Sequence, residues 1–86
     1  MLDELFLKHE DDLVRATAHK VMKYKIMLDA DELTKDEYRE LISDLLDISH
    51  IEKATDDLDR KVKLKEVFEI LKTIAAFAGG ILPLPG

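Results

Sequence analysis

The sequence predicts an all-α protein: a small three-helix bundle, made of a hairpin and a third helix, with an irregular apolar C-terminal tail. All three glycines and both prolines lie in residues 79–86, so no helix breaker interrupts the chain before them. The abundant Leu, Ile, Ala, Glu, Lys and Asp favour helices over strands and turns. We expect one helical domain over residues 1–78, with helices at about 3–28, 35–48 and 55–78, and a Gly/Pro apolar tail.

The first helix is predicted over residues 3–28, because apolar side chains recur there in steps of three and four. This stripe comprises Leu2, Phe6, Leu13, Thr17, Val21, Tyr24 and Leu28, widened by Leu5, Val14, Ala18 and Met22. Acidic residues crowd the first half of the segment, whereas Lys20, Lys23 and Lys25 occupy the second half. That distribution suits the helix dipole.

The start of the second helix is marked by Thr34 and Glu37, whose spacing predicts a capping box. Leu33 and Tyr38 stand at the two positions of a hydrophobic staple. The helix buries one apolar face, predicted to contain Tyr38, Leu41, Ile42, Leu45 and Ile48. Because the link over residues 29–33 is short, we expect the first two helices to form an antiparallel hairpin.

The third helix has two candidate starts. Ser49 and Glu52 repeat the capping-box spacing, and residues 54–57 offer a second start. Whether the second and third helices merge across residues 49–55 stays open at this point. The predicted apolar face of the third helix comprises Leu58, Val62, Leu64, Val67, Phe68, Leu71, Ile74, Ala75 and Ala78.

Length and composition limit the classes of function. A chain of 86 residues forms one domain and leaves little room for a large buried active site. It has no cysteine, and its net charge of −6 speaks against binding nucleic acid. The acidic N-terminus does not resemble a secretory signal, so a cytoplasmic location is expected. Ser43 and Ser49 lack a recognisable base, and no phosphate-binding motif is present. We therefore expect neither an enzyme nor a cofactor.

Two patterns raise the question of a metal site. An EF-hand loop starting at Asp29 would place Asp29, Asp31 and Glu40 at liganding positions. That loop fails elsewhere, because Leu33 replaces an oxygen ligand, Thr34 replaces the glycine of the turn, and Asp36 fills a normally apolar position. Asp47 and His50 have the spacing of half a carboxylate-bundle site, but neither His9 nor His19 has an acid three residues before it. We expect no metal ligands.

The segment LDADELTKDEYRELISDLL, residues 28–46, resembles the helical hairpin of short bacterial modules of the SHOCT kind. Leu33, Thr34, Glu37 and Tyr38 match the turn of that family, whereas Asp31 stands where those modules usually carry glycine. The chain as a whole resembles small helical proteins of tailed bacteriophages, which implies a virion, assembly or host-takeover role.

These observations predict a non-enzymatic interaction or assembly module that binds a protein partner or forms a homo-oligomer. The predicted contact residues are Phe77, Ile81, Leu82 and Leu84, in the uncharged end of the chain. The alternative is a membrane-peripheral protein that uses the apolar segment 73–86, and a second alternative is a metal-binding helical protein. The apolar end is too short to span a bilayer.

Overall fold

A computed structural model describes residues 4–78 and confirms the predicted all-α fold. Within that range the chain forms five helices and no strand. The helices are α1 (Glu4–Leu7), α2 (Asp12–Asp29), α3 (Lys35–Leu45), α4 (Ser49–Ala54) and α5 (Leu58–Ala78).

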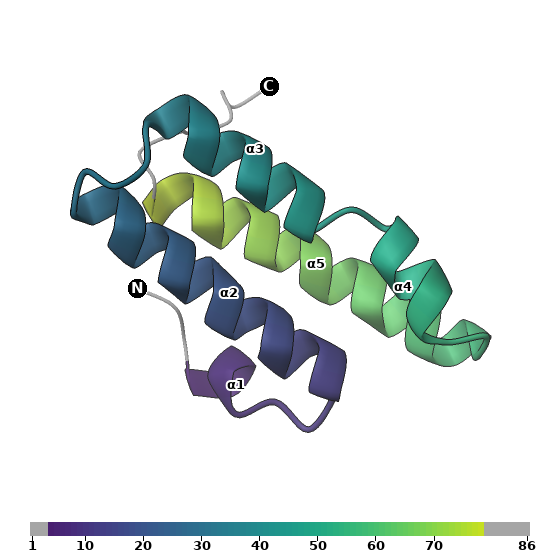
Figure 1. Ribbon diagram of the computed structural model, residues 1–86. Coiled ribbons are helices and arrows are strands. Elements are labelled where there is room, and N and C mark those ends of the chain that lie inside the picture. Colours follow the sequence, from purple (N-terminus) through teal and green to yellow (C-terminus); the bar gives the residue numbers. More distant parts are fainter. Residues whose placement is uncertain (1–3, 79–86) are drawn as a thin grey trace.

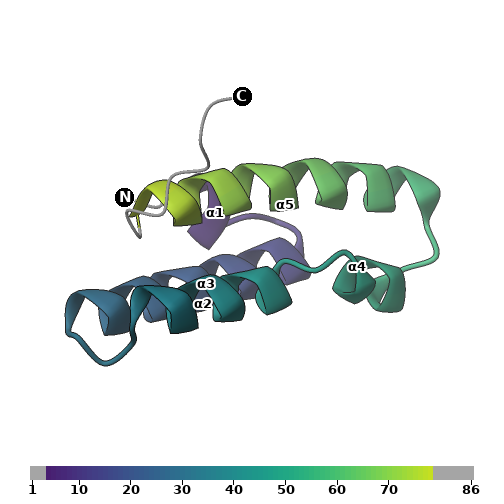
Figure 2. The same cartoon turned by 90° about the horizontal axis from the view of Figure 1, so that it is seen from above.

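The helices pack in two layers. α2 and α3 run antiparallel and side by side, which confirms the predicted hairpin, and α5 lies behind both of them (Figure 1). Seen from above, α2, α3 and α4 form one layer and α5 forms the other (Figure 2). α1 folds back beside α2, antiparallel to it (Figure 1).

The core lies between the two layers and is almost entirely aliphatic. Its buried apolar residues are Val14, Ala18, Val21, Tyr38, Ile42, Leu46, Ile51, Leu64, Phe68, Leu71 and Ala75. Burying one large apolar side chain contributes about 1.5–3 kcal/mol, so Leu64, Phe68 and Leu71 fix α5 against the hairpin.

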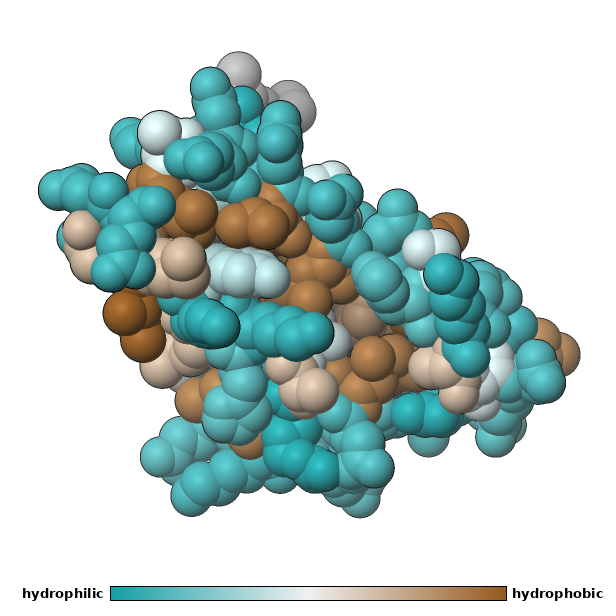
Figure 3. All heavy atoms as spheres, in the orientation of Figure 1, coloured by the Kyte–Doolittle hydropathy of each residue, from teal (hydrophilic) through white to brown (hydrophobic). Residues whose placement is uncertain are grey.

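Brown apolar atoms also reach the surface along the seam between α2 and α3, with teal polar atoms on either side (Figure 3).

The predicted helix over residues 3–28 is wrong as a single element, because the chain bends between α1 and α2. Asp11 has φ −78° and ψ 123°, outside the helical region, and its carboxylate accepts a hydrogen bond of 2.9 Å from the Leu13 N–H. It thereby caps α2. The carboxylate also contacts Arg60 of α5, and a periodic apolar stripe carries no information about a partner so distant in sequence.

The second and third helices are separate, and both predicted starts are used. The predicted helix over residues 35–48 ends at Leu45. α4 then begins at Ser49, where the Asp47 carboxylate accepts from the Ser49 N–H at 2.8 Å. The predicted start near residue 55 lies at Leu58, because Asp57 accepts from the Asp59 N–H at 2.9 Å. Both predicted starts therefore lie close to real helix starts, but the predicted Ser49–Glu52 capping box does not form, because Ile48 is the N-cap of α4 and its side chain makes no cap hydrogen bond.

Candidate functional site

The predicted contact residues divide between α5 and the tail. Phe77 lies on α5 and is 63% exposed. Ile81, Leu82 and Leu84 lie outside the described residues. Phe77 is therefore the predicted contact residue whose surroundings the structure defines.

Phe77 belongs to a row of exposed apolar side chains that we call the outer face of α5: Leu58, Val62, Ile70 and Phe77. These are 74%, 58%, 49% and 63% exposed, and their spacings of four, eight and seven residues place them on one side of a helix. Glu66 lies in the same row and is also exposed. The inner side of α5 carries the buried residues Leu64, Phe68, Leu71 and Ala75.

The exposure of this row differs from the prediction for the third helix. Leu58 and Val62 were predicted to share one apolar face of the third helix with Leu64 and Phe68, but they are exposed whereas the other two are buried. α5 is apolar around more of its circumference than the hairpin can cover. Sequence periodicity finds apolar positions, but it does not determine which of them a neighbouring helix reaches.

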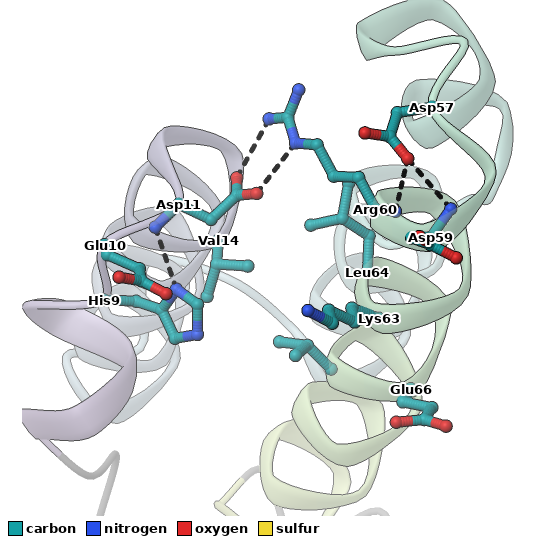
Figure 4. Close-up of a pocket in the computed structure, with 11 residues that line it drawn as sticks. His9, Glu10, Asp11, Val14, Asp57, Asp59, Arg60, Lys63, Leu64 and Glu66 are labelled. Carbon is teal, nitrogen blue, oxygen red and sulfur yellow. Dashed lines mark hydrogen bonds and ion pairs between the residues drawn. The ribbon is translucent and has the colours of Figure 1, made fainter.

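A second feature is a groove of about 770 Å³ between the α1–α2 junction and the first half of α5 (Figure 4). It is lined by His9, Glu10, Asp11, Val14, Asp57, Asp59, Arg60, Lys63, Leu64, Glu66 and Val67. Charged side chains from both elements surround a few apolar ones. No local sequence pattern indicates this groove, because its two walls are far apart along the chain.

Asp11 and Arg60 bridge the groove with two hydrogen bonds (Figure 4). Arg60 Nε lies 2.8 Å from Asp11 Oδ2, and Arg60 Nη2 lies 3.0 Å from Asp11 Oδ1. The contact with Arg60 holds the pKa of the Asp11 carboxyl below its usual value, and it raises the pKa of the Arg60 guanidinium. Both groups therefore stay charged across the neutral range. Two-point pairing of this kind fixes orientation as well as distance.

His9, in the wall of the groove, makes hydrogen bonds with the neighbouring backbone and with Arg15. His9 Nδ1 accepts a hydrogen bond of 3.0 Å from the Asp11 N–H. The His9 carbonyl accepts another, of 2.8 Å, from Arg15 Nη1. These contacts hold the α1–α2 junction in place. Their evident role is to position the backbone.

Asp47 and His50, the pair whose spacing raised the question of a metal site, have other partners in the fold. Asp47 accepts from the Ser49 backbone N–H, which lowers the pKa of its carboxyl. His50 Nε2 lies 2.8 Å from the Asp44 carbonyl oxygen. Among residues 4–78 no group of three or more His, Asp or Glu side chains is arranged to hold a metal ion.

The candidate calcium loop is a hairpin turn. Asp31 has φ 59°, in the left-handed region. Its N–H donates to the Leu28 carbonyl at 3.1 Å, and the Glu32 N–H donates to the Met27 carbonyl at 2.8 Å. This pattern is the Schellman motif that ends many helices, in which glycine is the preferred residue at the position of Asp31.

The predicted capping box is confirmed. The Thr34 N–H donates to Glu37 Oε1 at 2.9 Å, and the Glu37 N–H donates to Thr34 Oγ1 at 3.1 Å. The backbone bond from Thr34 lowers the pKa of the Glu37 carboxyl. Leu33 is half-buried and Tyr38 is fully buried; their staple contact stays a prediction.

Tyr38 has a role that sequence reasoning missed. Its hydroxyl donates to the Ala75 carbonyl at 2.9 Å and so joins α3 to the last turn of α5. Burial raises the pKa of this phenol. No local signal pointed to this contact, because the two residues are 37 positions apart.

Comparisons with protein-family models, with curated proteins and with solved structures each return no match to this chain. None of the helices between residues 4 and 78 combines the length and apolar character that a membrane crossing requires.

Proposed function

We propose that this protein is a non-enzymatic helical interaction module that binds a protein partner or a second copy of itself through the outer face of α5. The observation that carries the proposal is the exposure of Leu58, Val62, Ile70 and Phe77 along one side of the longest helix within residues 4–78. Isolated exposed apolar residues are common on proteins, whereas an aligned row of them is typical of an interaction site.

The geometry of the row favours a helical partner. Ridges of side chains spaced three and four residues apart pack into the grooves of a neighbouring helix. Glu66 lies among the apolar residues of the row and makes no ion pair within the described part of the chain. A partner helix with apolar residues beside a Lys or Arg would cover the row and pair with this carboxylate.

The test compares Ile70→Lys and Phe77→Lys with Ile26→Lys. Ile26 is a matched control, because it is 60% exposed on α2, away from the outer face of α5. Sedimentation velocity from micromolar to millimolar concentration should show association of the wild-type chain, its loss in the two α5 variants and its retention in Ile26→Lys. A wild-type chain that stays monomeric throughout would rule out self-association through this face.

A membrane-peripheral role for the apolar segment 73–86 is the second candidate, favoured by the exposed aromatic ring of Phe77. Flotation with anionic liposomes separates the two candidates. If the protein is an interaction module, it should stay in the dense fraction, apart from the liposomes. A chain shortened after Ala78 should then behave like the full-length protein. Flotation of the full-length chain that the shortened chain loses would support membrane binding.

A further inference from the structure

The junction between α1 and α2 combines a helical sequence with a bent backbone. Residues 8–11 contain neither Gly nor Pro, and the apolar stripe of the flanking segments keeps a helical period across them. The chain nevertheless turns back at this point, so that α1 lies antiparallel to α2 (Figure 1). The same four residues can therefore serve as a bend or as part of a continuous helix.

Several side-chain contacts hold the bent form, among them the bond of 3.0 Å from the Asp11 N–H to His9 Nδ1. Asp11 caps α2 through the Leu13 N–H and pairs with Arg60, and Arg15 donates to the His9 carbonyl. In a continuous helix the Leu13 N–H would bond to the His9 carbonyl instead. Asp11 could then no longer act as a cap, because a capping residue has a non-helical backbone. The choice between bend and helix thus depends mainly on Asp11.

The bend places α1 against the rest of the molecule. Phe6 and Leu7 are half-buried and pack against the core. α1 has only four residues, too few for a helix to persist by its own hydrogen bonds. Its position therefore depends on this packing, and straightening of the junction would remove Phe6 and Leu7 from the surface that they cover.

We propose that α1 is exchanged between two copies of this chain. Straightening of residues 8–11 would join α1 and α2 into one helix that projects away from its own core and leaves the α1 position empty. The α1 segment of a second copy carries identical side chains and fits that position. Reciprocal exchange closes a two-fold dimer. The exchange does not use the outer face of α5, so it and the proposed function can fail separately.

The test fixes the bend with Asp12→Pro. Asp12 is the first residue of α2, a position that proline favours, and Asp11 before it already has the extended backbone that a following proline requires. In the continuous helix the same proline would lie in the interior. The association constant of the dimer should therefore fall by about a hundredfold for each of its two chains that carries the proline. Asp12→Ala is the control, because it removes the same carboxylate without adding a proline.

The complementary variant is Asp11→Ala, which removes the cap and the Arg60 pair from the bent form and should increase dimerisation by about fivefold or more for each chain. Thr34→Ala is its control, because it removes a comparable cap from α3. Light scattering coupled to gel filtration, from micromolar to millimolar concentration, measures the dimer. Ile70→Lys is included to identify any dimer formed through the outer face of α5.

A dimer that is lost in Asp12→Pro and retained in Asp12→Ala and Ile70→Lys supports exchange, as does a dimer promoted by Asp11→Ala and not by Thr34→Ala. A dimer that survives in Asp12→Pro overturns it. So does an Asp11→Ala chain that remains folded and monomeric over the whole range. A dimer lost only in Ile70→Lys overturns exchange and supports the proposed function.

Discussion

The Tyr38 hydroxyl donates a hydrogen bond of 2.9 Å to the Ala75 carbonyl, and both residues are buried. The bond fastens the beginning of α3 to the last turn of α5, where helix carbonyls lack partners of their own. It therefore fixes the end of α5 that carries Phe77, a residue of the proposed interaction surface.

Tyr38→Phe should lower the free energy of unfolding by about 1 kcal/mol, because it removes one buried hydrogen bond and keeps the ring. Urea unfolding followed by circular dichroism measures the loss. Tyr24→Phe is the matched control: Tyr24 is half-buried, and its hydroxyl makes no hydrogen bond within residues 4–78. Equal effects of the two substitutions would contradict a structural role for the Tyr38–Ala75 bond.

Asp31→Gly should raise the free energy of unfolding by about 0.5 to 1 kcal/mol, because Asp31 has φ 59° and glycine adopts this region without steric cost. Asp31→Asn separates the contribution of charge, since it removes the carboxylate and retains a side chain that tolerates the same backbone. Thermal unfolding ranks the three chains. A glycine variant no more stable than the asparagine variant would show that backbone strain is negligible here.

Thr34→Ala should cost about 1 kcal/mol of stability, because it removes the hydroxyl that caps α3. Association through the outer face of α5 should be unchanged. Urea unfolding and sedimentation velocity measure the two quantities on the same preparation. Loss of association with unchanged stability would mean that Thr34 contacts the partner.

The Asp11–Arg60 pair should make stability depend on acid. Because the folded pKa of Asp11 lies below its ordinary value of 3.8, the contribution of the pair is complete above that value and is lost as pH falls through the lowered pKa. In Asp11→Asn the unfolding free energy should be lower at neutral pH and should decline less in acid. Urea titrations from neutral pH down to pH ~3 measure this difference.

Arg60→Gln provides the control for this pH dependence. Like Asp11→Asn, it should reduce the loss of unfolding free energy in acid. The double variant should differ little from either single variant, because the two residues act as one pair. Additive effects of the two substitutions would show that each residue stabilises the fold separately.

The local features of the fold were predictable from sequence. Thr34 and Glu37 specify the start of α3, because a cap and its partner lie three residues apart. Residues 54–57 marked the start of α5, where Asp57 accepts from the Asp59 N–H. Residue 49 marked the start of α4 without the predicted capping box, and the two signals left open whether one or two helices followed. The α2–α3 hairpin followed from two amphipathic segments and a short link.

The remaining features depend on residues distant in sequence. Apolar spacing alone predicted a continuous first helix, and the bend is held by an ion pair between residues 49 positions apart. The exposure of Leu58 and Val62 could not be predicted, because it depends on how far the hairpin covers α5.

The sequence by itself determined that the chain is helical, where most helices begin, and which residues are apolar, since these properties depend on short-range hydrogen bonding and periodicity. Only the tertiary structure decided that α1 turns back at Asp11, that Tyr38 holds Ala75, and that one apolar side of α5 faces solvent. Those outcomes depend on which surfaces meet when the layers pack, and the free energy of that packing is shared among residues that no local pattern connects.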